Sequence, residues 1–121
     1  MRNKVFVNNH GVIECHVIGD QTLESITKMG QEIMAHLTEL KAQHKPLLIL
    51  DDITEIGKVP AEGRNAVVEL TKKLQYNRLA MYGKNGLIRV GANLIFRASG
   101  RSKKLKYFTN YSEAMSWLLA R

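Results

Sequence analysis

The sequence predicts an α/β fold with a single small mixed, mostly parallel sheet of about five strands and about four helices on its two faces. Three observations support this fold class. Short apolar runs bounded by Gly, Pro and Asn alternate with longer segments whose apolar residues recur every three to four positions. The 121 residues and the apolar fraction of 45% suit one globular domain covering residues 1–121. Alternating strands and helices favour a layered, largely parallel sheet.

The first third of the chain predicts two strands followed by a long helix. "KVFVNN" and "VIECHVIG" are the strands, and the turn-forming cluster "NNHG" joins them. Successive side chains of a strand point to opposite faces, so the second strand has two different faces. One face carries Ile13, Cys15 and Val17, and the other carries Val12, Glu14, His16 and Ile18. Asp20 is the expected N-cap of the helix. Its apolar stripe is Leu23, Ile26, Gly30, Ile33, Leu37 and Leu40, and the helix should end near Gln43 because Pro46 follows.

The middle of the chain predicts a buried strand, a helix and another strand. Pro46 to Asp51 is an apolar run without alternation, which is typical of a strand buried on both faces. Residues 60–74 form a helix that begins near Pro60. Its inward residues are Val67, Leu70 and Leu74. The strand "NRLAMYG" follows and is closed by a glycine.

The last third predicts a helix, a strand and a closing helix. "NGLIRVGANLIFRASG" is the first helix, ending at Gly100, with an expected inward set of Leu87, Val90, Leu94 and Ala98. "KLKYFTN" is the last strand. Asn110 and Glu113 have the spacing of a capping box, and the helix that they open should bury Ala114, Trp117 and Leu118.

The segment "NRLAMYGKNGLIRVGANLIFRASGRSKKLKYFTNYSEAMSWL" resembles the C-terminal half of SpoIIAA-like proteins, a branch of the STAS-type fold. The resemblance lies in a strand ending "AMYG", an apolar helix, a strand ending "YFTN" and a closing "EAMSWL" helix. The preceding elements have the matching order, so the resemblance spans nearly the whole chain. It implies a small mixed sheet and a binding or regulatory module, often dimeric, without a fixed chemistry.

The segment after the buried strand is a candidate functional loop, with Asp51, Asp52, Thr54 and Lys58 as its candidate residues. STAS-type anti-sigma-factor antagonists, which the chain resembles, have a phosphorylated serine in the equivalent loop. The loop "DDITEIGKVPAEGRN" has no serine, and Thr54 is its one hydroxyl, so the switch is not carried over. Adjacent aspartates on an extended chain point to opposite sides and do not converge on one substrate atom. The interpretation is that they hold the loop in place.

Charge is concentrated in the second half of the chain. Residues 1–71 carry 7 Lys/Arg and 10 Asp/Glu, a net −3, whereas residues 72–121 carry 11 and 1, a net +10. The candidate anion or partner surface comprises Lys84, Asn85, Arg89, Phe96, Arg97, Arg101, Lys103 and Lys104. Basic residues with a nearby aromatic can contact nucleic acid or an acidic membrane. The alternative interpretation is a solvated basic surface that binds nothing specifically.

Other chemistry has little support in the sequence. His10, His16, His36 and His44 lack the close spacing of a zinc site, and Cys15 lies on an apolar strand face. We expect no enzyme activity, no metal and no cofactor. One cysteine, no signal-peptide pattern and no long apolar run favour a cytoplasmic protein.

The sequence therefore predicts a non-catalytic binding or regulatory module that binds a protein partner or a small apolar ligand. A second copy of the chain is one possible partner, giving a homodimer. The alternative function is binding of an anionic surface through the basic C-terminal half.

Overall fold

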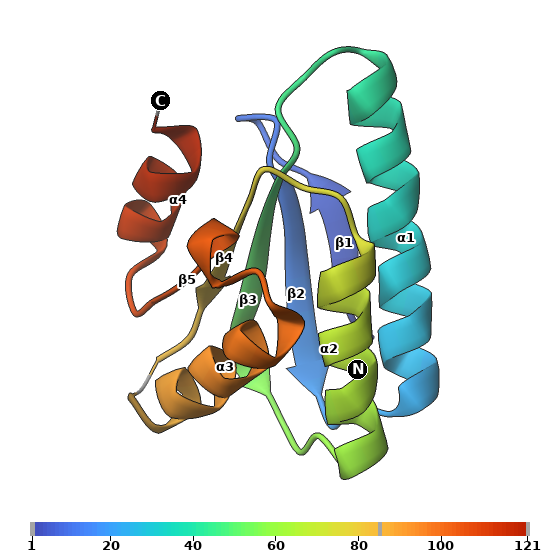
Figure 1. Cartoon of the computed structure of the whole chain (residues 1–121), viewed down its shortest axis with the longest axis vertical. Coiled ribbons are helices and arrows are strands. Elements are labelled where there is room, and N and C mark those ends of the chain that lie inside the picture. The colour runs from blue at the N-terminus through green and yellow to red at the C-terminus, as the bar shows by residue number, and fades with distance from the viewer. Residues whose placement is uncertain (1, 85, 121) are drawn as a thin grey trace.

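The computed structural model describes residues 2–84 and 86–120, with residues 86–88 described by their backbone alone. The described residues form ten elements along the chain, and Figure 1 shows how the helices and strands are arranged. They are β1 (Lys4–Val7), β2 (Ile13–Gly19), α1 (Leu23–Ala42), β3 (Leu48–Ile56), α2 (Ala61–Lys73), β4 (Arg78–Tyr82), α3 (Gly86–Ser99), the 3₁₀ turn η1 (Ser102–Lys104), β5 (Leu105–Phe108) and α4 (Tyr111–Leu119). The expected fold class is confirmed.

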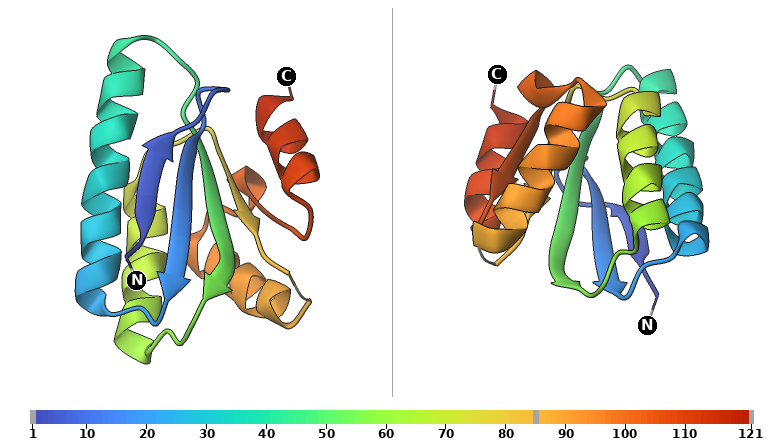
Figure 2. Two further views of the ribbon diagram at one scale, coloured as in Figure 1. Left: turned by 180° about the vertical axis from the view of Figure 1, so that it is seen from behind. Right: turned by 60° about the horizontal axis from the view of Figure 1, so that its bottom comes forward.

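The five strands form one mixed sheet in the order β1-β2-β3-β4-β5. β1 pairs with β2 in antiparallel fashion, and the other three pairings are parallel. Each parallel pair needs a crossover helix, and such crossovers are almost always right-handed. Because the order never reverses, α1, α2 and α3 all lie on the same face. Of the described helices, only α4, which follows the last strand, covers the other face (Figure 2).

Both faces of the sheet are packed with apolar side chains, so β3 is buried on both sides as expected. Ile49 faces the core beneath α1, α2 and α3, together with Ile13, Ile33 and Phe96. Leu50 faces the smaller core beneath α4. The three-helix face therefore holds the larger core, and the α4 face is covered only in part.

The expected N-cap of α1 is wrong. Thr22 is the N-cap, and its hydroxyl accepts from the Ser25 amide at 3.0 Å while the Ser25 hydroxyl accepts from the Thr22 amide at 2.9 Å. Asp20 instead accepts a hydrogen bond from the Lys58 amide at 2.8 Å. The turn before α1 is thus tied to the loop after β3, which moves the start of the helix by two residues. The end near Gln43 is confirmed.

Strand β3 extends beyond the predicted end at Asp51 and reaches Ile56. Asp51, Asp52 and Thr54 therefore lie in a strand, and their assignment to a loop is wrong. The physical reason is pairing with β2, which continues until Ile56 lies opposite Gly19. The neighbouring strand supplies hydrogen bonds that the local sequence does not reveal. The prediction that the two aspartates face opposite sides is confirmed by their surroundings, described below.

The expected inward face of α3 is also wrong. Val90 and Leu94 are 61% and 59% exposed, whereas Ala92 and Phe96 are each 4% exposed. Ala98 is exposed as well, and the side chain of Leu87 lies outside the described residues. This helix has apolar residues on all sides, so periodicity alone does not determine its orientation. In α4, Ala114 and Leu118 are buried as expected, and Trp117 is half-buried.

Candidate functional site

A cavity of about 310 Å³ lies over the carboxyl ends of β2, β3 and β4, between α2 and α3. We call it the α2–α3 cavity. In the right-hand view of Figure 2, the ends of β2 and β3 are visible between these two helices. The apolar lining comprises Val17, Ile26, Met29, Ile53, Ile56, Val59, Val67, Met81, Ala92 and Ile95. The carboxyl ends of parallel strands are where ligands of open α/β sheets commonly bind.

One polar side chain on β3, Asp51, lines this cavity among the apolar ones. Its Oδ1 atom is inaccessible to solvent and has no hydrogen-bond partner among the described residues. Burial raises the pKa of Asp51 to about 6, although a hydrogen bond from the thiol of Cys15 acts in the opposite direction. A buried carboxyl oxygen without a partner costs free energy, so such an atom calls for an explanation.

Cys15 lies opposite Asp51 on the neighbouring strand and is fully buried. Burial, and then the charge of Asp51, raise the pKa of its thiol well above the ordinary value of 9.0. A thiol with a raised pKa holds its proton and is a poor nucleophile. The prediction that Cys15 is a small buried residue is confirmed.

The other polar residues around the cavity are already engaged. The amide of Gln21 donates to the backbone oxygens of Ile18 and Gly19, each at 3.1 Å. Arg64 is exposed, and its guanidinium donates to the Val59 carbonyl at 3.0 Å. Asp51 is thus the polar group in the lining that retains a buried, unused hydrogen-bonding atom.

The opposite face of the sheet carries a network of polar side chains, of which only Asp52 was a candidate functional residue in the sequence. We call it the open-face network, and its members are Asn8, Glu14, His16, Asp52 and Tyr111. The left-hand view of Figure 2 shows this face, where no described helix covers β1 and β2. His16 Nε2 lies 2.6 Å from Glu14 Oε2, and His16 Nδ1 lies 3.6 Å from Asp52 Oδ2.

Further contacts bind this network to its surroundings. Tyr111 of α4 donates to Glu14 at 2.7 Å, and Asn8 donates to the same carboxylate oxygen at 3.1 Å. The ring of Phe6 stacks on His16 with centroids 5.6 Å apart. Thus β1, β2, β3 and α4 all contribute to one set of contacts.

The pKa values of Glu14 and Tyr111 reflect these contacts. Burial alone would raise the pKa of Glu14, but hydrogen bonds from His16, Tyr111 and Asn8 outweigh it and lower the pKa below its ordinary value. Burial, and then the hydrogen bond to Glu14, raise the pKa of Tyr111 to about 12. The signal in the sequence was the shared strand face of Glu14 and His16. The partners Asp52 and Tyr111 come from register and from the position of α4.

The comparisons with known proteins now bear on this geometry. The family model described as SpoIIAA-like matches residues 12–119, which includes every element from β2 to α4. The chain belongs to the SpoIIAA-like family. The resemblance expected from the "AMYG", "YFTN" and "EAMSWL" segments is therefore confirmed. No match is found among curated proteins.

Among the solved structures that are similar to this chain, one is covered over most of its length. It is an uncharacterized protein of the DUF3478 family with a SpoIIAA-like fold, from Shewanella loihica PV-4. The TM-score is 0.75 and the sequence identity is 19%, with 97% of this chain and 94% of that chain covered. At this identity the likeness concerns the fold of the SpoIIAA-like domain.

The residues of the predicted anion surface have different surroundings in this SpoIIAA-like domain. Phe96 is buried in the core, and Asn85 lies outside the described residues. Arg101 donates to the Leu74 carbonyl and lies over the Tyr76 ring. Four cations of the basic half lie 5.4 to 5.6 Å from aromatic ring centroids, in the pairs Arg78–Trp117, Arg89–Tyr107, Arg101–Tyr76 and Lys106–Phe108.

The remaining residues of that predicted surface point to solvent. Lys84, Arg97, Lys103 and Lys104 are exposed, and the Lys104 ammonium lies 3.5 Å from the Tyr76 carbonyl. They come from the β4–α3 loop, α3 and η1. Binding of anions by these side chains stays a prediction.

The candidate loop residues divide between two roles. Asp52 accepts hydrogen bonds from the Thr54 amide at 2.9 Å and the Thr54 hydroxyl at 2.6 Å. Lys58 is exposed, and its backbone pairs with Asp20 and Gln21. Asp52 therefore bonds to a residue of its own strand, β3, and the expected role of the two aspartates in holding a loop stays a prediction.

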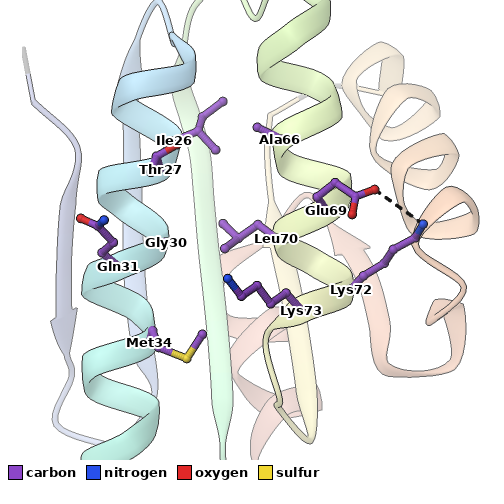
Figure 3. A pocket seen from close by; sticks show the side chains of 10 residues that line it. All are labelled: Ile26, Thr27, Gly30, Gln31, Met34, Ala66, Glu69, Leu70, Lys72 and Lys73. Carbon is purple, nitrogen blue, oxygen red and sulfur yellow. Dashed lines mark ion pairs between the residues drawn. The ribbon is translucent and has the colours of Figure 1, made fainter.

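A second, larger hollow of about 810 Å³ lies between α1 and α2 and is drawn in Figure 3. Leu70 points from α2 toward Gly30 of α1, where an added Cβ would come within 2.6 Å of the leucine. Lys72 and Glu69, 3.7 Å apart, pair with each other on the same helix. This groove has no buried unpartnered polar atom among the described residues, so it gives no comparable indication of a ligand.

No three His, Cys, Asp or Glu side chains of the described residues are grouped so that they could hold a metal ion. No helix in the described part of the chain is long and apolar enough to cross a membrane.

Proposed function

We propose that this SpoIIAA-like chain is a non-catalytic binding module that holds a small apolar ligand in the α2–α3 cavity. The observation that carries the proposal is an apolar cavity of about 310 Å³ at the carboxyl ends of three parallel strands. Ligand pockets are typically clefts of about 300–1,000 Å³ with apolar walls and few polar groups. In the described residues we assign no comparable preformed feature to a protein partner, the other predicted binder.

A non-catalytic role is proposed because the chemical groups near the cavity are poorly placed for a reaction. Asp51 and Asp52 lie on opposite faces of the sheet, so they do not form a carboxylate pair. Cys15 is buried with a raised pKa. Residues 51–64 contain no serine, so the proposal includes no phosphorylated-serine switch of the anti-sigma-factor antagonist type.

The test is a fluorescence titration with N-phenyl-1-naphthylamine, an apolar dye that brightens on leaving water. We expect saturable binding of one dye molecule per chain. Gly91 lines the cavity, and a Cβ added there meets no atom within 4 Å. Gly91→Phe should therefore fold and weaken dye binding by obstructing the cavity, while Gly91→Ala should bind as the parent does.

A matched control uses the neighbouring position on the same helix. Val90 is 61% exposed and does not line the cavity, so Val90→Phe adds similar bulk outside it. Dye binding that is unsaturable, or equally weakened by the substitutions at both positions, would contradict the proposal.

The alternative function, binding of an anionic surface, has weaker support. Several cations of the basic half contact aromatic rings or carbonyls of the chain itself. Sedimentation with acidic lipid vesicles at low and high salt tests this alternative directly. Strong binding at low salt that is lost at high salt, and lost in Arg97→Ala with Lys103→Ala, would favour it.

A further inference from the structure

The α2–α3 cavity combines an apolar interior with one buried acceptor that nothing in the described chain satisfies. Oδ1 of Asp51 is shielded from solvent and has no partner, and Asp51 lines the cavity. Apart from the thiol of Cys15, which hydrogen-bonds to the Asp51 carboxylate, the surrounding side chains from β2, β4, α1 and α3 are aliphatic or thioether groups, such as Val17, Met29, Met81 and Ile95. These groups have no N–H or O–H to donate.

A carboxylate oxygen is satisfied only by a donor. Resting on the proposed function, we infer that the ligand of this cavity has an apolar body with a hydroxyl or ammonium group that donates to Oδ1 of Asp51. An anionic head group such as a carboxylate is disfavoured at this position, because it would lie against a second carboxylate in an apolar, water-poor environment.

The main alternative hypothesis is an acidic ligand that pairs with Arg64 at the rim of the cavity. Arg64 is exposed, and its guanidinium already donates to the Val59 carbonyl at 3.0 Å. An ion pair at an exposed site contributes little to affinity, whereas a donor reaching a buried charged acceptor contributes more. The balance therefore favours a donor contacting Asp51 over an acid contacting Arg64.

The test compares three compounds with the same ten-carbon chain: decan-1-ol, decylamine and decanoic acid. Each displaces N-phenyl-1-naphthylamine from the unaltered protein at neutral pH. We expect the alcohol and the amine to bind about tenfold or more tightly than the acid, since a hydrogen bond to a charged group has that magnitude. Lowering the pH below the pKa of Asp51, about 6, should weaken the amine and strengthen the acid.

Asp51→Asn is the diagnostic variant, because an amide of the same shape both donates and accepts. It should remove the preference against decanoic acid. The comparison of ligands on the unaltered protein stands on its own even where the variant is unstable.

The outcomes separate the two proposals. If the dye and all three compounds fail to bind, the result contradicts both the proposed function and this inference. If all three compounds displace the dye equally well, or decanoic acid binds most tightly, the cavity binds ligands but the assigned role of Asp51 is wrong. Loss of an acid preference in Arg64→Gln would identify the rim arginine as the anchor instead.

Discussion

Asp51 and Asp52 are adjacent in the sequence and lie in opposite environments in the fold. Asp51 faces α1, α2 and α3, where its Oδ1 atom is shielded from solvent and has no partner among the described residues, and burial raises its pKa to about 6. Asp52 faces the other side, where Thr54 donates to it twice and His16 lies nearby. The same residue type is thus a poorly satisfied group on one face and a member of a hydrogen-bonded network on the other.

The two faces of the sheet differ in whether their polar groups have hydrogen-bond partners. On the three-helix face, three helices exclude water and no described donor reaches Asp51 Oδ1. On the α4 face, Glu14 accepts from Tyr111 and Asn8 and contacts His16, so its burial is compensated. Unsatisfied groups in otherwise well-packed proteins frequently mark functional positions. This contrast supports the proposal of a ligand site on the three-helix face.

The largest expected effect concerns the pH dependence that Asp51 imposes. Its folded pKa of about 6 exceeds the ordinary 3.8, so the folded state holds the proton more tightly. Stability contributed by this group is present below pH 3.8 and is lost as pH rises to about 6, a change of about 3 kcal/mol. Urea unfolding across this pH range should show the loss in the parent and its absence in Asp51→Asn. Parallel pH profiles for the two proteins would contradict the assignment.

Glu14 should show the opposite dependence. Its pKa is lowered below 4.5, so its stabilising contribution is present at neutral pH and is lost as pH falls through the folded pKa. Glu14→Gln removes the charge that its three donors contact, and we expect a loss of about 2 kcal/mol near neutral pH. The measurement is the same urea series extended to acid. A variant as stable as the parent at neutral pH would show that the open-face network contributes little.

Tyr111→Phe should have a smaller effect, because one hydrogen bond is removed and the side chain is 40% exposed. We expect a loss of about 1 kcal/mol in thermal or urea unfolding. Tyr82, whose ring lies edge-on to that of Tyr111, offers a matched control. Tyr82→Phe removes a hydroxyl from the same ring pair without touching Glu14 and should cost less. Equal losses in the two variants would argue against a specific bond to Glu14.

The smallest expected effect tests the orientation of α3. Leu94 is 59% exposed, so Leu94→Gln should change the free energy of unfolding by no more than about 0.5 kcal/mol. Phe96, two positions further on and 4% exposed, is the inward control, and Phe96→Ala should cost several times as much. If Leu94→Gln proves the more damaging of the two, the helix has the orientation that its sequence pattern first suggested.

Much of the architecture was predictable because it rests on local patterns. Alternation in "VIECHVIG" assigned Cys15 to the buried face, and the unbroken apolar run "LLIL" marked a central strand. Asn110 and Glu113 located the start of the last helix, and Asn110 does accept from the Glu113 amide at 3.0 Å. Each of these features depends on residues a few positions apart.

The errors occurred where distant segments decide the outcome. The N-cap of α1 moved from Asp20 to Thr22 because Asp20 binds the amide of Lys58, which is far along the chain. Strand β3 extends beyond Asp51 because β2 continues to pair with this strand. The orientation of α3, apolar on all sides, was decided by which face fits the sheet at Ala92 and Phe96.

For the candidate site, too, some features depend on local sequence and others on contacts between distant segments. The sequence by itself determined that Asp51 and Asp52 face opposite ways, because an extended backbone alternates its side chains. Only the tertiary structure decided that Asp51 has an apolar cavity above it and Asp52 a histidine beside it. Cavities and polar networks form where side chains from several elements meet, and the distances among α2, α3 and β3 are set by packing of the whole core.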